Sequence, residues 1–453
     1  MQEETIAAIA TPPGTGGVAI IRISGPQAKD VLRRVFSRGV FEHARMYHGR
    51  IVRDGELLDE GMAVFFRAPH SYTGEDVAEL HCHGSLVGLR GVLDFVFASG
   101  ARPAQAGEFT RRAFLNGKMD LTQAEAVCDF ISASSKAGAK ASLRQLAGGL
   151  KDTVSAFQSE LTDLLARVTA AVEYPEEDLE HEITADALPL IGKLKKNIGQ
   201  LADTFEQGRV LKEGLDAAIA GKPNVGKSSL MNALLGHERA IVADVPGTTR
   251  DTIDHSFYID DIRINLTDTA GIRKTDDFIE NKGVERSKNA VKTSKLTIFV
   301  LDAAEGISAE DQDVFETLKS SEADVLVVLN KLDASERLTE KDVLSQFPAY
   351  PVLCVSAKTG EGMEALRAWL YQYALKDQTS AEGTVITNLR HRYALLDAAA
   401  KLGEAQDALE HGMDMDCVTI DLNGAWMSLG EITGNTVSEE IIDRVFENFC
   451  LGK

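Results

Sequence analysis

A glycine-rich segment, GKPNVGKSS (221–229), follows an apolar run and opens a helix-like pattern. It matches G-x-x-x-x-G-K-[ST], in which backbone N–H groups surround phosphate oxygens. In that motif Lys227 reaches the β and γ phosphates, and the Ser228 hydroxyl binds magnesium. The segment therefore predicts a nucleoside triphosphate site. The expected phosphate contacts are Asn224, Val225, Gly226, Lys227, Ser228 and Ser229.

Two segments are expected on the metal side of the phosphates. DTAG (268–271) closes an apolar run, so Asp268 is placed to hold magnesium through water and the Gly271 amide to contact the γ phosphate. TTRD (248–251) lies between the first two expected strands, and Thr249 is best placed to complete the magnesium shell. The expected contacts from these segments are Thr248, Thr249, Asp268, Thr269, Ala270 and Gly271.

Two later segments indicate which base is bound. NKLD (330–333) follows an apolar run, and the Asp333 carboxylate accepts two hydrogen bonds from guanine that adenine does not offer. SAK (356–358) follows the last expected strand and is expected behind the base. The order of these motifs predicts GTP as the ligand. The expected contacts here are Asn330, Lys331, Asp333, Ser356, Ala357 and Lys358.

The group that orients the attacking water is not evident from the motifs. The residue after DTAG is Ile272, and an apolar side chain cannot position water. One candidate is Glu280 in DDFIENKGVER (276–286), for which a solvent-exposed charge is the alternative interpretation. The other is a monovalent cation held by the side-chain oxygen of Asn224. Both remain open at this point.

Strands that alternate with helices must position these segments. Alternation of this kind predicts a mostly parallel, doubly wound sheet. The strand-like runs are LDAAIA (215–220), DIRINLTDT (261–269), LTIFVLDA (296–303), DVLVVLNK (324–331) and PVLCVSA (351–357).

Helical spacing dominates on both sides of that region. Apolar residues recur at steps of three and four between Leu150 and Val172, and again between Ile191 and Phe205. The spacing returns after Asn388, and Thr436-Val-Ser-Glu439 predicts a capping box that opens the last helix. Because the ends of an inserted domain lie close together, we expect 119–210 and 381–453 to form one helical domain around an inserted domain at 211–380. Residues 1–118 mix short strands with a helix and predict a separate α+β domain.

Composition limits the partners of the chain. Its 453 residues carry a net charge of −21, which argues against coating nucleic acid by bulk electrostatics. By segment, 1–118 sums to +1, 119–210 to −6, 211–380 to −8 and 381–453 to −8. The amino-terminal segment, with Arg111, Arg112 and Lys118, is therefore the surface expected to be available to RNA. Five scattered cysteines and the lack of a long apolar run predict a cytoplasmic protein without a membrane segment.

At this point the chain resembles the bacterial tRNA modification GTPase family called MnmE or TrmE. The resemblance covers the whole chain and rests on long signature blocks. They are TPPGTGGVAIIRISGP (11–26), YTGEDVAELHCHGS (72–85), GEFTRRAFLNGKMDLTQAEA (107–126), PNVGKSSL, VPGTTRD and FCLGK (449–453).

The resemblance implies a multidomain α/β fold: an amino-terminal α+β domain that dimerises and binds tetrahydrofolate, a discontinuous helical bundle, and an inserted Ras-like P-loop G domain. It implies a homodimer that joins an FAD-containing partner in a heterotetramer. With GTP hydrolysis in magnesium and potassium, and 5,10-methylene- or 5-formyl-tetrahydrofolate as one-carbon donor, the family adds an aminomethyl or carboxymethylaminomethyl group at C5 of the tRNA wobble uridine.

The resemblance also implies roles for single residues. Potassium would be held by Asn224, Ala243, Val245 and Thr248, in the GTP-binding loop that also contains Asp244, Pro246 and Gly247. Glu280 would orient water, and folate would be held by Arg22, Glu79, Lys118 and Lys453. Ala243 stands where threonine is common in the family, so potassium binding here would rest on its carbonyl.

Two questions stay open from the sequence. Cys450, between Phe449 and Leu451, is either a catalytic nucleophile or a packed small apolar side chain. The G-domain motifs and the apolar residue after DTAG also occur in ribosome-assembly GTPases that act as RNA-binding switches. Those proteins usually carry a basic RNA-binding module, whereas residues 381–453 sum to −8. A regulatory GTPase scaffold is a third possibility.

Overall fold

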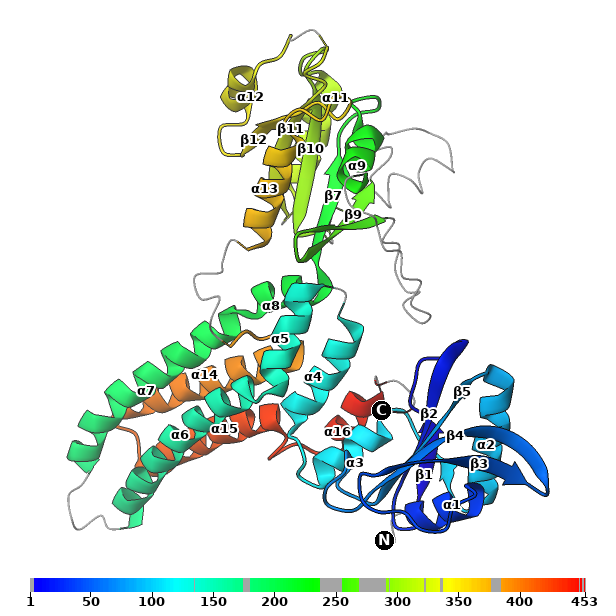
Figure 1. Ribbon diagram of the computed structural model, residues 1–453. Helices are drawn as coiled ribbons and strands as arrows, with labels where there is room; N and C mark the ends of the chain where they lie inside the picture. Colours follow the sequence, from blue (N-terminus) through cyan, green and yellow to red (C-terminus); the bar gives the residue numbers. More distant parts are fainter. Residues whose placement is uncertain are drawn as a thin grey trace, which may run out of the picture. The chain divides into compact units, whose positions relative to one another are not determined.

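The computed structural model describes most of the chain. The described residues are 4–133, 135–173, 180–236, 255–268, 291–292, 294–321, 323–334, 337–375, 384–447, 449 and 452. They form two compact units (Figure 1). One unit contains residues up to Ile131, Ser142–Gln200 and Tyr393 onward, and the other contains Ser132–Ala141 and Leu201–Arg392.

A six-stranded sheet opens the first unit. Its strands are β1 (Ile6–Ile9), β2 (Gly16–Ser24), β3 (Met46–Arg53), β4 (Glu56–Phe66), β5 (Val77–Gly84) and β6 (Arg102–Pro103). Their spatial order is β3-β4-β5-β2-β1-β6, and the pairs are antiparallel except for β1 with β6. Helices α1 (Ala28–Val35) and α2 (Leu86–Ala98) share one apolar core with this sheet.

The other elements of the first unit are helices, and some of these helices extend beyond the residue ranges of that unit. They are α3 (Glu108–Leu115), α4 (Leu121–Ser132), α5 (Lys136–Leu146), α6 (Gly149–Glu173), α7 (Glu180–Asp203), α14 (Leu389–Glu410), α15 (Met415–Thr433) and α16 (Glu439–Glu447). Helices α6 and α15 lie side by side: the Gln158 side chain donates to the Trp426 carbonyl at 3.1 Å, and the Trp426 indole donates to Thr162 at 3.1 Å. Two helices far apart in sequence therefore pack together.

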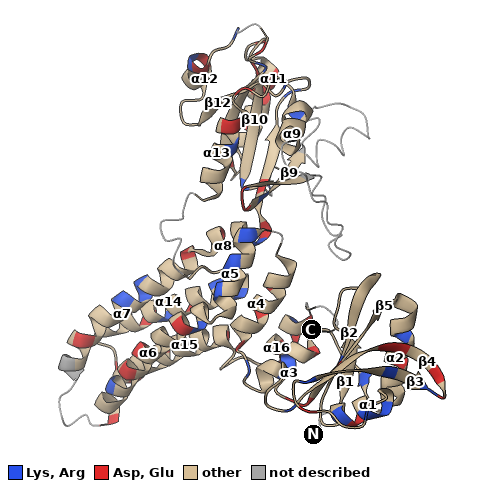
Figure 2. Ribbon diagram, viewed as in Figure 1, with Lys and Arg blue, Asp and Glu red and all other residues tan. Residues whose placement is uncertain are grey.

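Charged side chains of both signs are interspersed on these helices (Figure 2). Between α6 and α7, Lys193 lies 3.1 Å from Glu160, and Arg167 pairs with Asp186 at 2.5 Å. These cations are therefore partly neutralised by neighbouring carboxylates. Among the described residues, no helix has the length and apolar composition needed to cross a membrane.

The second unit contains another six-stranded sheet. Its strands are β7 (Leu215–Ala220), β8 (His255–Ile259), β9 (Ile262–Asp268), β10 (Leu296–Asp302), β11 (Asp324–Asn330) and β12 (Val352–Cys354), in the order β12-β11-β10-β7-β9-β8. All pairs are parallel except β8 with β9. The helices are α8 (Phe205–Glu213), α9 (Lys227–Leu235), α11 (Ala309–Lys319), α12 (Glu340–Gln346) and α13 (Met363–Ala374).

Two apolar cores flank this second sheet. One joins it to α9 and α13, through residues such as Leu230 and Leu366, and the other joins it to α11 and α12, through Phe315 and Val343. Each core is apolar because a parallel strand buries both of its faces. The prediction of a multidomain α/β protein with a doubly wound sheet is confirmed.

In the second sheet the sequence reasoning missed one strand, and elsewhere it misplaced the start of the last helix. Strand β8, an antiparallel edge strand, was not predicted, since polar residues interrupt its short apolar run. The capping box at Thr436 is wrong: helix α16 begins at Glu439, and the Thr436 hydroxyl donates instead to the Met427 carbonyl of α15 at 2.8 Å. The local pattern predicts a helix cap at Thr436, but its hydroxyl forms a hydrogen bond with another helix instead.

Candidate functional site

The phosphate-binding loop connects β7 to α9, and two of its glycines explain its shape. A side chain at Gly221 would place Cβ 2.5 Å from the Val300 carbonyl of β10. Gly226 has a φ of +95°, and a Cβ there would lie 2.4 Å from Nδ2 of Asn330. Only glycine satisfies both the backbone angle and the close approach. The backbone of the loop therefore lies in close contact with Val300 of β10 and with Asn330 at the end of β11.

Lys227 is the first residue of α9 and is buried within this loop. Its ammonium donates to the carbonyls of Gly221 at 2.8 Å and Lys222 at 2.9 Å. Ser228 follows in the first turn of α9. The amides and positive dipole end of a helix favour an anion at this position.

The base-side motifs bond directly to the phosphate-binding loop. The Asn330 side chain donates to the Val225 carbonyl at 2.9 Å and accepts from the Ala357 amide at 3.1 Å. Lys331 has a left-handed φ of +70°, and its ammonium lies 2.6 Å from both the Asn224 carbonyl and Asp302 Oδ2. The structure thus brings three separate sequence motifs together at the carboxyl ends of β7, β11 and β12.

The loop that contains Ser356 and Lys358 orients the Asp333 side chain. Its Oδ1 accepts a 2.7 Å hydrogen bond from the Ser356 hydroxyl, and Lys358 Nζ lies 3.6 Å from Oδ2. The hydrogen bond from Ser356 is the largest cause that holds the pKa of Asp333 below its usual value, and Lys358 adds to it. The carboxyl group is therefore ionised at neutral pH, as an acceptor for two guanine N–H groups must be.

The metal side is described only in part. Asp268 is the last residue of β9, and its backbone pairs in register with Ile219, two residues before the phosphate-binding loop. The remaining predicted residues lie outside the described part of the chain. They are Ala243, Asp244, Val245, Pro246, Gly247, Thr248, Thr249, Thr269, Ala270, Gly271, Glu280, Cys450 and Lys453.

A second candidate site lies on the sheet of the first unit. Arg22 of β2 faces Glu79 of β5 across the antiparallel ladder, and Arg22 Nε donates to Glu79 Oε1 at 2.9 Å. His81 Nε2 lies 3.3 Å from the other carboxylate oxygen. Burial raises the pKa of Glu79, but the hydrogen bonds and charges of His81 and Arg22 together outweigh burial and lower that pKa. The carboxylate is therefore ionised although it is largely buried.

A cavity of about 340 Å³ opens beside Glu79. It is lined by Phe66, His70, Ser71, Tyr72, Val77, Glu79 and Lys118. The Arg22 guanidinium lies over the Tyr72 ring at 5.1 Å, and Lys118 donates to the Pro69 carbonyl at 3.0 Å. Three of the four residues predicted for folate are thus close together. Gly452, the neighbour of Lys453, approaches the Ile9 carbonyl so closely that a Cβ would lie 2.1 Å from it.

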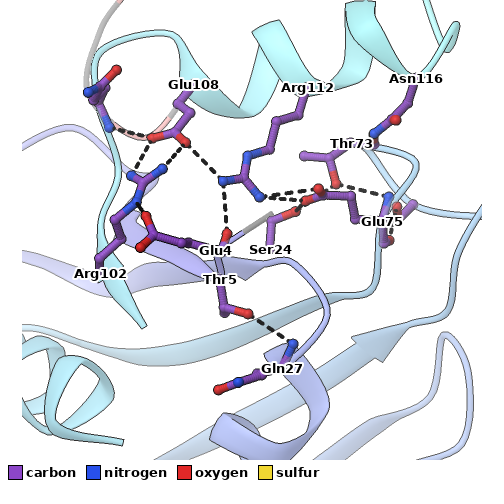
Figure 3. A network of polar contacts seen from close by, with 12 residues as sticks. Glu4, Thr5, Ser24, Gln27, Thr73, Glu75, Arg102, Glu108, Arg112 and Asn116 are labelled. Atoms are coloured by element: carbon purple, nitrogen blue, oxygen red, sulfur yellow. Dashed lines mark hydrogen bonds and ion pairs between the residues drawn. The ribbon is translucent and has the colours of Figure 1, made fainter. Parts of the chain in front are cut away.

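A buried ionic network adjoins this region, and sequence reasoning missed it (Figure 3). Arg112 donates to Glu75 at 3.0 Å and to Glu108 at 2.9 Å, and Arg102 donates to Glu108 at 2.7 Å. Burial works to raise the pKa of Glu108, but the hydrogen bonds from Arg102, Gln105 and Arg112 lower it to about 2. The network ties the loop that carries Glu75 to helix α3.

This network corrects the expectation that Arg112 is available to RNA. Arg112 is only 6% exposed, because its guanidinium is enclosed by carboxylates and by the Glu4 carbonyl. Arg111 lies 2.9 Å from Asp443 of α16. Arg112 is therefore enclosed, whereas Arg111 forms a partly exposed ion pair. A pair of adjacent arginines on a helix gives no local signal that one of them faces the core.

Comparisons with known proteins agree with the motifs. The family described as "GTP-binding protein TrmE N-terminus" matches residues 5–118, and the "MnmE helical domain" matches residues 121–450. The tRNA modification GTPase MnmE of Clostridioides difficile is 42% identical over 461 residues, which cover 100% of this chain and 99% of that protein. The chain belongs to the MnmE family. The family protein of Natranaerobius thermophilus is 38% identical and covers 100% of both chains.

Solved structures are also similar to part of the chain. The G domain of the Thermotoga maritima FeoB iron transporter is 27% identical over 35% of this chain and 98% of that one, with a TM-score of 0.28. Membership of the MnmE family makes the chain a GTP hydrolase of tRNA modification, with tRNA as its substrate.

Proposed function

We propose that this member of the MnmE family is a potassium-activated GTPase that works with a folate one-carbon donor and an FAD-containing partner on the tRNA wobble uridine. The observation that carries the proposal is the joint presence of two prepared sites in one chain: an ionised guanine acceptor at Asp333 and an ionised carboxylate, Glu79, beside a cavity. The product would be an aminomethyl or carboxymethylaminomethyl group at C5 of that uridine.

The residues of the GTP site fit magnesium and potassium. Ser228 at the start of α9 supplies a hydroxyl, and Asp268 ends the strand next to the loop; with Thr249 they are the oxygen donors that magnesium prefers. Asn224 is exposed in the loop and would hold potassium with Ala243, Val245 and Thr248. When bound, potassium would supply positive charge to the phosphates. Glu280 would then orient the attacking water.

The cavity beside Glu79 fits a pterin and its charged tail. An ionised carboxylate accepts hydrogen bonds from ring N–H and amino groups, Tyr72 offers an aromatic face, and Lys118 and Arg22 offer cations. We assign 5,10-methylene- or 5-formyl-tetrahydrofolate to this place, with Lys453 as a further ligand. We propose Cys450 as a candidate nucleophile of the one-carbon step.

The remaining partners follow from the same reaction. The redox step needs a flavin, and the sequence has no dinucleotide-binding G-x-G-x-x-G unit, so an FAD-containing partner would supply it in a heterotetramer. We assign dimerisation to residues 1–118, the helical domain to 119–210 with 381–453, and the G domain to 211–380. Because tRNA is the substrate, we place the protein in the cytoplasm.

The cation requirement can be tested by GTP hydrolysis in potassium or sodium chloride at equal ionic strength. We expect the rate to be at least tenfold higher in potassium, and equal rates would contradict the proposal. Glu280→Ala should retain GTP binding and lose about 10²- to 10⁴-fold in kcat. Glu285→Ala, a carboxylate in the same segment, is the matched control and should hydrolyse GTP normally.

The modification itself is tested by mass spectrometry of wobble uridines in tRNA from a deletion strain. Loss of the C5 group that the intact gene restores is the expected result. Normal modification would favour a ribosome-assembly role. Glu79→Gln should distinguish the role of the folate site from that of the GTP site. We expect it to weaken folate binding, measured by calorimetry, and to leave GTP hydrolysis unchanged.

A further inference from the structure

The second residue of the phosphate-binding loop is a lysine in a position that the motif leaves open. Lys222 is 8% exposed, although lysine is rarely buried without a partner. Its ammonium lies 3.0 Å from Asp311 Oδ2, 3.1 Å from Glu305 Oε2 and 3.3 Å from the Ser308 hydroxyl. The side chain therefore points away from the phosphates and toward the start of α11.

The partner of Lys222 is itself fixed. Ser308 and Asp311 form a capping box at the start of α11, in which Asp311 Oδ2 accepts from the Ser308 amide at 2.9 Å and from its hydroxyl at 2.6 Å. Asp311 has no exposed surface, and its Oδ1 has no hydrogen-bond partner among the described residues. A buried carboxylate requires a cation, and Lys222 supplies it.

The backbone of Lys222 takes part in the nucleotide site. Its carbonyl accepts from Lys227 at 2.9 Å, next to the Gly221 carbonyl that accepts from the same ammonium at 2.8 Å. One residue thus connects the phosphate-binding lysine to the start of α11. The opposite side of the loop is held independently, by Lys331 on the Asn224 carbonyl and by Asn330 on the Val225 carbonyl.

We propose that Lys222 is a positioning residue for GTP, which anchors the entry of the phosphate-binding loop to Asp311 and Glu305 and so keeps the loop in the shape that retains nucleotide. Burial lowers the pKa of Lys222, but the hydrogen bonds and charges of the two carboxylates outweigh burial and raise it. The anchor is therefore charged throughout the neutral range. Without it, the entry of the loop loses its side-chain tie to the start of α11, while the Asn330 and Lys331 contacts on the opposite side remain.

The test is the dissociation rate of a fluorescent GDP analogue, measured by stopped flow on the full-length protein. Lys222→Met removes the charge and keeps the length of the side chain. We expect about tenfold faster dissociation, the equivalent of roughly 1.4 kcal/mol, with a matching rise in KM for GTP and a kcat within about twofold of wild type. Lys222→Arg keeps the charge and should recover most of the lost retention.

The control is Lys341→Met, which removes an exposed lysine of the same domain and should leave dissociation unchanged. A purely structural role would lower the melting temperature of Lys222→Met without altering its dissociation rate at 25 °C, and that result would overturn the proposal. If the methionine variant does not fold, Lys222→Gln decides, because glutamine retains a hydrogen bond to Asp311 but not the charge. Dissociation from that variant at the wild-type rate would also overturn it.

Discussion

The two six-stranded sheets place their functional side chains in different ways. In the parallel sheet, the phosphate-binding loop, Lys331 and Asp333 follow directly after β7 and β11, so they meet at one edge. In the first sheet, Arg22 and Glu79 lie within strands and meet only because β2 and β5 pair in one register. In a parallel sheet, functional residues therefore come from short motifs at the ends of strands. In an antiparallel sheet, they are brought together by strand pairing that no short motif encodes.

The two sites also differ in what holds them. Around the GTP site, Lys227, Lys331 and Asn330 donate mainly to backbone carbonyls. Beside the cavity of the first unit, Arg112 and Glu108 bond mainly to other charged side chains in the interior. Changes at the first site should alter ligand binding, and changes in the second network should alter folding.

The largest effect should come from the guanine acceptor. Asp333→Asn replaces an acceptor of two N–H groups with an amide, which suits xanthine better than guanine. We expect the preference for GTP over xanthosine triphosphate to change by roughly 10⁴-fold. Competition binding measures this ratio. Asp313→Asn, an exposed change on α11, is the control, and an unchanged ratio in Asp333→Asn would mean that the NKLD motif does not select the base.

The buried network should give the largest effect on stability. Arg112→Met leaves Glu75 and Glu108 without their shared cation, which costs about 3–5 kcal/mol in the free energy of unfolding. Arg33→Met removes an exposed pair with Asp30 and should cost at most about 1 kcal/mol. Urea unfolding followed by circular dichroism compares the two. Similar losses in both variants would mean that the buried network stabilises the fold no more than an exposed ion pair does.

A smaller effect is expected from the loop glycine. Gly226→Ala requires a left-handed alanine and a Cβ 2.4 Å from Asn330 Nδ2, so the loop must shift. The backbone strain alone is worth about 1–3 kcal/mol. Calorimetric titration with GDP should show weaker binding, and the strain should also lower the melting temperature. Gly306→Ala is a control with a similar φ of +86° and open space around its Cβ position, and it should bind GDP normally.

The smallest effect is a pH dependence. The pKa of Glu108 is about 2, below its ordinary 4.5, so its contribution to stability is complete above about 4.5 and is lost as pH falls toward 2. Urea midpoints measured at pH 6 and pH 3.5 should therefore fall more in wild type than in Glu108→Gln. Parallel falls in the two proteins would show that this carboxyl group does not carry the dependence.

These differences explain how much the sequence could predict. All five strand-like runs after residue 210 contain strands. Strands β10 and β11 are almost continuously apolar because parallel strands bury both faces, whereas β9 alternates apolar and polar residues. The contacts among Asn330, Val225 and Ala357 follow from the order of the motifs. The burial of Arg112 and the anchor of Lys222 could not be predicted, since Arg112 depends on Glu75, 37 residues away, as well as on Glu108, and the carboxylates that hold Lys222 are far away in the chain.

Asn224 has a φ of +66°. The residue at this position must therefore accept a left-handed backbone angle and also supply the side-chain oxygen proposed to hold a cation. Asparagine and glycine accept this backbone angle readily, while most other residues are strained by it. The usual alanine scan would confuse the two demands at this position, because alanine removes the side-chain oxygen and distorts the loop at once. Glycine removes only the oxygen. The left-handed backbone thus makes Asn224→Gly the informative exchange for any cation bound there.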